Sequence, residues 1–258
     1  MNPTYNRAAR SPAVSRTGAM RRGNVRYGMD EAKEKSVFRQ GWEAVKASWP
    51  PMLLIQLIVL TVVVGYFIFE PIRGGLVGFS NFKDQAGWMF ILGSGFVTGG
   101  FLPEVAKTLV GRVPTINKEW WGRWSFAGLV YGLTGGLVWG LYKFLDAAFG
   151  PTTNAWILIQ KVAFDMFVFT PFLSIPFATA MFAWRKAHWN PDALLDGYSP
   201  KRYMKNVAPG VVMCWFFWGP VVAMIYTLPE RLQFVVSAGC QAAWSILFVF
   251  MVENRAKS

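Results

Sequence analysis

An aspartate, Asp165, lies in the middle of the apolar stretch QKVAFDMFVFTPFLSIPF, which covers residues 160–177. A carboxylate inside an apolar helix is costly, so it normally faces the interior of a helix bundle or a water-filled cavity. Lys161 precedes it by four residues and would share its helical face, so we expect the two charges to pair. Two interpretations follow. The favoured one is that the ion pair only fixes helix packing, and the other is a polar path along the helix, with Asp165 as the charge that selects or gates ions.

Two prolines, Pro171 and Pro176, follow in the same stretch. A proline has no backbone N–H, so each one frees a carbonyl about one turn back, near Phe167 and Phe172. Inside a membrane these carbonyls need a donor from another helix, from a hydroxyl such as that of Thr170, or from water. We therefore expect a kinked helix that lines the polar path.

Two further pairs of charges lie at the ends of apolar segments. Glu104 and Lys107 lie one helical turn apart, just after Pro103, and are candidates for extending the polar path. An anchor at the membrane interface is the alternative for this pair. Lys143 and Asp146, also three residues apart, are explained as a pair whose long side chains reach toward the interface.

Cysteine and histidine offer little for catalysis or metal binding. Cys214 and Cys240 both lie in apolar runs, which favours small core residues over a disulfide. The sequence has a single histidine, His188, so neither a zinc site nor a Cys–His catalytic pair is expected. No glycine-rich phosphate loop is present, and an enzyme acting on lipids would need clustered acids or histidines. We expect no metal, no cofactor and no enzymatic activity.

The composition is typical of an integral membrane protein. Of 258 residues, 53% are hydrophobic and only 16% are charged. A membrane-spanning helix needs about 20 apolar residues, and six segments qualify: 52–69, 88–110, 125–147, 156–183, 207–228 and 232–252. We expect an all-α transmembrane bundle over residues 50–258, with six spans; four spans with re-entrant or interfacial helices are the alternative. Glycine-rich runs in the second and third segments predict close helix packing.

The N-terminal region differs from the rest of the chain. Residues 1–29 contain six arginines and no acid, which is typical of an organelle-targeting segment or of a disordered arm near anionic lipid. Residues 30–49 place apolar side chains at helical spacing against a charged face, which predicts an amphipathic interfacial helix. No nucleic-acid partner is expected, because no aromatic platform accompanies the arginines.

The basic residues between the spans alternate. The connections after the second and fourth segments and the two termini are rich in Lys and Arg, whereas the other connections carry few. The positive-inside rule therefore predicts both termini on the matrix or cytoplasmic side. The sparse connections contain Arg73, Lys83 and Arg231.

From about Leu109 onward, the order of features resembles a known family. A glycine-rich segment, WGRWSFAGLVYGLTGGLVWGLYKFLD, precedes a Lys, an Asp and a Pro-Phe pair, and a Trp-Gly-Pro motif, a Leu-Pro corner with a nearby Arg, and a late Trp follow. This series is similar to that of the Mpv-seventeen and PMP-twenty-two family of small multi-pass proteins of peroxisomal and inner mitochondrial membranes. Met166 replaces the family's Gln, and residues 221–226 replace its polar side chains after the Trp-Pro motif. The motif positions are Trp139, Tyr142, Lys161, Asp165, Phe172, Trp218, Pro220, Pro229, Arg231 and Trp244.

The resemblance implies a membrane channel or a permeability-modulating protein of an organelle membrane. The basic, acid-free N-terminus favours the mitochondrial inner membrane, and a peroxisomal, plastid or bacterial inner membrane stays open. The alternative is a non-catalytic structural or assembly subunit of a larger membrane complex. The expected partners are the lipid bilayer and either further copies of the chain or a larger complex.

Overall fold

The computed structural model describes residues 37–109, 117–192, 194, 199–200 and 203–256, and the side chains of the last helix only as far as Ile246. Every element in these ranges is a helix, so the expected all-α class is confirmed. The targeting segment expected at 1–29 and the first part of the expected interfacial helix lie outside the described residues. In chain order the elements are α1 (Val37–Ile68), α2 (Glu70–Ala86), α3 (Trp88–Gly95), η1 (Phe96–Phe101), α4 (Leu102–Leu109), α5 (Lys118–Phe149), α6 (Ala155–Phe164), η2 (Asp165–Ser174), α7 (Ile175–Lys186), η3 (Tyr203–Val207), α10 (Ala208–Ile225) and α11 (Glu230–Ala256), where η marks a π-helix.

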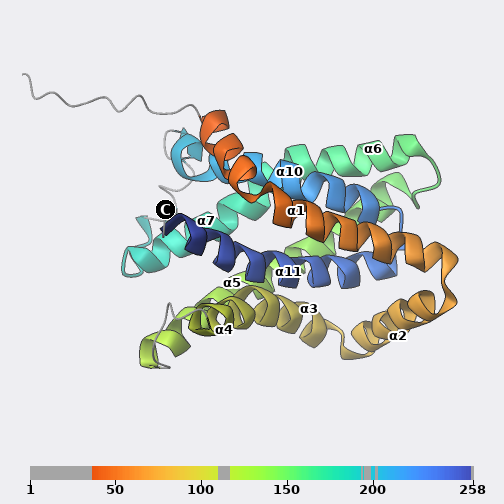
Figure 1. Cartoon of the computed structure of the whole chain (residues 1–258), viewed down its shortest axis with the longest axis horizontal. Helices are drawn as coiled ribbons and strands as arrows, with labels where there is room; N and C mark the ends of the chain where they lie inside the picture. The colour runs from red at the N-terminus through yellow and green to blue at the C-terminus, as the bar shows by residue number, and fades with distance from the viewer. Residues whose placement is uncertain (1–36, 110–116, 193, 195–198, 201–202, 257–258) are drawn as a thin grey trace, which may run out of the picture. The chain divides into compact units, whose positions relative to one another are not determined.

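Helix α1 joins two segments that we expected to be separate. It runs through Pro50 and Pro51 without ending, so the boundary placed at residue 50 is not a break in the helix. Figure 1 shows a change of direction along α1, which is the usual effect of proline inside a helix. Its first half packs against α10, where a Cβ added to Gly41 would lie 2.6 Å from Val212 Cβ. That residues 37–49 lie at a membrane interface stays a prediction.

Helix α2 occupies a stretch that we expected to be a loop. Its residue Arg73 donates to the carbonyls of Tyr66 and Phe67 at the end of α1, over 3.1 and 3.0 Å. These bonds satisfy two of the carbonyls that a helix end leaves open. On its other side, Ser80 Oγ and Lys83 Nζ both donate to the carbonyl of Arg231, over 3.0 and 2.8 Å. Helix α2 therefore bridges the end of α1 and the start of α11.

Glycines bring the second span against α5, as the glycine-rich runs predict. The second span is the continuous series α3, η1 and α4. A Cβ on Gly95 would lie 2.3 Å from the carbonyl oxygen of Tyr131, and one on Gly100 would lie 2.5 Å from Gly128 Cα. No larger residue fits at these contacts without moving the backbone of α5.

Five helical stretches within the described residues are long and apolar enough to cross a bilayer. Only 28–33% of the most apolar part of each is buried, so most of its residues are at least partly exposed, which is compatible with contact to lipid. The sixth expected segment, 232–252, coincides with α11, but side chains beyond Ile246 are not described, and the count of six stays a prediction. The five stretches are Ser48–Ile68, Trp88–Leu109, Lys118–Phe149, Ala155–Lys186 and Tyr203–Ile225.

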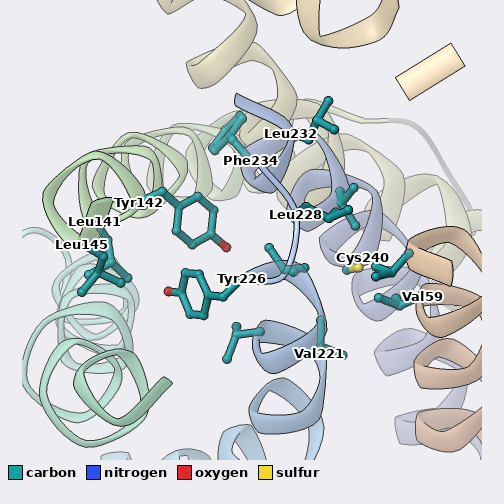
Figure 2. Packing of buried hydrophobic residues seen from close by; sticks show 14 of the residues in the cluster. Val59, Leu141, Tyr142, Leu145, Val221, Tyr226, Leu228, Leu232, Phe234 and Cys240 are labelled. Carbon is teal, nitrogen blue, oxygen red and sulfur yellow. The ribbon is translucent and has the colours of Figure 1, made fainter. Parts of the chain in front are cut away.

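Helix α11 lies between α1 on one side and the second span on the other (Figure 1). Around it, apolar side chains of α1, α5 and α10 form one buried cluster. Figure 2 shows part of this cluster, in which Tyr142 of α5 faces Tyr226 just after the end of α10. Their rings meet edge to face with centroids 5.5 Å apart. This core holds the walls of a cavity in place.

Candidate functional site

A cavity of about 210 Å³ lies inside the bundle. Its walls come from α3 and η1, α5, η2 with the start of α7, α10 and α11, so segments from across the sequence converge on it. Among the described residues that line it, Asp165 is the one Asp, Glu, Lys or Arg. Six wall residues carry aliphatic hydroxyls: Ser94, Thr98, Thr134, Thr170, Ser174 and Ser237.

Two neutral hydroxyl groups hold the carboxylate of Asp165. The residue is 5% exposed. The hydroxyl of Tyr226, which is fully buried, donates to Oδ2 over 2.6 Å, and Thr170 Oγ1 donates to Oδ1 over 3.3 Å. These bonds orient the carboxylate but leave its charge uncompensated, and an uncompensated buried charge is expensive.

The expected pair of Lys161 and Asp165 does not form. Lys161 is 1% exposed, and its Nζ lies 3.1 Å from Oδ1 of Asp146 on α5. The expected pair of Lys143 and Asp146 is replaced as well, because Lys143 Nζ lies 3.0 Å from Oε2 of Glu230. In both cases the lysine forms its ion pair with a carboxylate on a neighbouring helix. These ion pairs tie α5 to α6 and α11 and leave Asp165 to the cavity.

The two prolines do lie in a distorted part of the fourth span. Pro171 is inside the π-helix η2, which begins at Asp165, and Pro176 follows in the first turn of α7. In a π-helix each N–H bonds to the carbonyl five residues back, so the carbonyls left open belong to Met166 and Pro171. They are one residue earlier than the α-helical spacing predicts.

Side chains from the fifth span satisfy these two carbonyls. Trp215 Nε1 donates to the carbonyl of Met166 over 2.6 Å, and the Tyr203 hydroxyl donates to that of Pro171 over 2.7 Å. Of the three sources considered, another helix, a nearby hydroxyl or water, the structure shows the first, and the two carbonyls are not those of Phe167 and Phe172. The two bonds fix the course of η2 and thereby place Asp165 and Thr170 at the cavity wall.

Glu104 and Lys107 lie at the end of the second span and do not line the cavity. Glu104 is 3% exposed and accepts from both Lys107 Nζ, at 2.5 Å, and Arg123 Nε, at 3.2 Å. With two cations on one carboxylate, this cluster joins α4 to α5. The structure does not bring it together with Asp165, although we considered both for one polar path.

The positions taken from the family resemblance are spread over the bundle. Tyr142, Trp218 and Trp244 line the cavity with Asp165. Phe172 is 68% exposed, and Trp139 packs against Trp88 with ring centroids 4.8 Å apart. The remaining positions have structural places: Pro220 inside α10, Pro229 just before α11, and Arg231, whose carbonyl holds α2.

Several residues of the site were not among those predicted from the sequence. They are Tyr226 on the carboxylate, Trp215 and Tyr203 on the freed carbonyls, and Asp146 on Lys161. The available signal was the presence of Tyr and Trp inside apolar spans, because a buried Tyr or Trp usually finds a hydrogen-bond partner.

The arrangement can hold water or a small polar or cationic solute inside a membrane. Within the residues that the structure describes, no group of three or more His, Cys, Asp or Glu side chains lies close enough to hold a metal ion. The cavity offers one carboxylate, the amide of Gln241, the thiol of Cys214, hydroxyls and aromatic rings. Comparison with protein-family models, with curated proteins and with solved structures gave no match for this chain.

Proposed function

We propose that the protein is a membrane channel or permeability-modulating protein whose cavity is the chamber that a small solute enters. The observation that carries this proposal is Asp165, which lies on a hydroxyl-rich wall inside a bundle of membrane-spanning helices. Ionisable groups at such depth are costly and commonly mark the path of an ion or substrate. The proposal agrees with what the resemblance to the Mpv-seventeen and PMP-twenty-two family implies.

We further propose six spans, with both termini on the matrix or cytoplasmic side and the mitochondrial inner membrane as the location. In Figure 1, α1 begins and α11 ends at the same end of the bundle. The end of α4, the start of α5 and the end of α7 lie at this end too, and the sequence around these helix ends is rich in basic residues. Basic residues on one side support this orientation.

The test is conductance of the purified full chain in planar lipid bilayers, compared with Asp165→Asn. The substitution removes the charge while keeping the size of the side chain and an oxygen that accepts from Tyr226. We expect discrete current steps from the native protein and an altered preference for cations over anions in the variant. Asp192→Asn, which neutralises an exposed carboxylate in a polar connection, is the matched control and should conduct like the native protein.

A bilayer that stays silent with folded protein would refute the channel proposal. The alternative function, a non-catalytic subunit of a larger membrane complex, would then be favoured. Pro171→Ala belongs in the same series, because it changes the backbone of η2 without changing any charge. Unchanged selectivity in Asp165→Asn, together with native-like currents, would exclude this carboxylate from the conducting path.

A further inference from the structure

We infer that the cavity binds a small organic ammonium ion, held between the carboxylate of Asp165 and the aromatic rings of the wall. This inference rests on the proposed function, because it names the class of solute that enters the chamber. It is carried by three properties of the cavity: its charge, its aromatic surface and its size.

The charge of the wall selects against anions. Asp165 is held by the neutral hydroxyls of Tyr226 and Thr170, and no Lys or Arg is among the described residues that line the cavity. The nearest basic residue along the chain, Lys161, is bonded to Asp146. An anion would meet an uncompensated negative charge in a low-dielectric site, whereas a cation would neutralise it.

The aromatic surface favours an organic cation over a metal ion. The wall includes the rings of Tyr131, Tyr142, Phe169, Trp218, Phe234 and Trp244. Aromatic faces attract cations and serve in the recognition of quaternary ammonium groups. A hard cation instead needs about six or more oxygen ligands around it to replace its hydration shell, whereas the wall has a single carboxylate and hydroxyls that come from several different helices.

The volume limits the ligand to a few heavy atoms. Sites for drug-sized ligands measure about 300–1,000 Å³, whereas this cavity measures about 210 Å³. The wall hydroxyls, such as those of Ser94 and Ser237, can bond to a hydroxyl group on the ligand. An ammonium ion with a short hydroxylated arm, of which choline is the simplest probe, matches this combination.

The test is calorimetric titration of the purified full chain, in detergent micelles, with choline chloride. The neutral probe of the same shape is 3,3-dimethyl-1-butanol, called dimethylbutanol below, in which carbon replaces the nitrogen of choline. Sodium chloride is the inorganic probe. We expect choline to bind, and both other probes to bind at least about tenfold more weakly. Equal binding of dimethylbutanol, or of sodium, would overturn the inference.

Two variants locate the site. Asp165→Asn should weaken choline binding by about tenfold or more, because it removes the one charge, and Trp218→Leu should weaken it by about threefold to tenfold through the lost ring. Neither should change the binding of dimethylbutanol to the same extent. Asp192→Asn should bind choline like the native protein, and equal affinities in all variants would place any bound choline outside the cavity.

The outcome separates this inference from the proposed function. Protein that conducts but does not bind choline would overturn the inference and leave the channel standing. Protein that binds choline in a manner dependent on Asp165 but stays silent in bilayers would support the site and refute the channel.

Discussion

The charged side chains of this protein fall into two kinds. Most buried or half-buried charges are balanced by opposite charges on a neighbouring helix, as with Lys161 and Asp146 or Glu104 and Arg123. Asp165 differs, because its hydrogen bonds come from two neutral hydroxyls and it lines a cavity. Pairs of opposite charge have a structural explanation, because they link neighbouring helices. Among the described residues no cation balances Asp165, and this difference makes Asp165 the candidate for a functional role.

We predict that the hydroxyl of Tyr226 contributes more to the free energy of unfolding than an ordinary surface hydroxyl does. Tyr226→Phe keeps the buried ring but removes the donor to Asp165 Oδ2, which lies 2.6 Å away. We expect the free energy of unfolding in mild detergent to fall by about 1–3 kcal/mol, because a buried acceptor loses its partner. Tyr66→Phe, on the half-buried Tyr66 of α1, is the control and should cost less than about 0.5 kcal/mol. Equal stability of the two variants would mean that water in the cavity replaces the lost donor.

Among the elements, η2 determines how the site is built. A π-helix is rare and frequently marks a functional site. This one starts at Asp165, contains Pro171, and has its freed carbonyls satisfied by side chains of the fifth span. The prolines in the sequence predicted a distortion and freed carbonyls in need of a donor, for which another helix, a hydroxyl and water were the alternatives. They could not predict the π register, since the same proline spacing fits a kinked α-helix, and the choice depends on Trp215 and Tyr203 reaching the freed carbonyls.

We predict that the hydrogen bond from Trp215 to the carbonyl of Met166 replaces the backbone N–H that Pro171 lacks. Trp215→Phe should lower the free energy of unfolding by about 1–3 kcal/mol, because the carbonyl is left without a donor. In a Pro171→Ala background the new N–H at position 171 can donate to that carbonyl, so the same substitution should cost less. A double-mutant cycle of unfolding free energies measures this coupling.

Tyr203→Phe provides the matched control for that cycle. The Tyr203 hydroxyl donates to the carbonyl of Pro171 itself, and a new N–H at position 171 does not supply that carbonyl with a donor. Its cost should therefore be the same with Pro or Ala at position 171. Additive costs for Trp215→Phe as well would show that the π register does not link this carbonyl to Pro171.

At the scale of the whole molecule, apolar length predicted the helices well. The second expected segment, 88–110, coincides with Trp88–Leu109, and the fourth, 156–183, lies within Ala155–Lys186. Helix α2 was not predicted, because contacts with distant parts of the chain, such as that between Lys83 and the carbonyl of Arg231, hold it in place. The cavity was not predicted either. Its polar residues are scattered singly over several spans, and hydropathy does not determine how each helix is rotated about its axis.

At the scale of the whole chain, an even or odd number of membrane spans determines whether the two termini lie on the same side of the membrane. If α11 crosses the bilayer like the five described spans, the count is even and both termini lie on one side. The start of α1 and the end of α11 lie at the same end of the bundle in Figure 1, which agrees with an even count. We expect epitope tags added to the two ends of the chain to be protected from protease together in sealed vesicles, or exposed together. Opposite accessibility of the tags would exclude six spans and would mean that one of these helices lies along the membrane rather than across it.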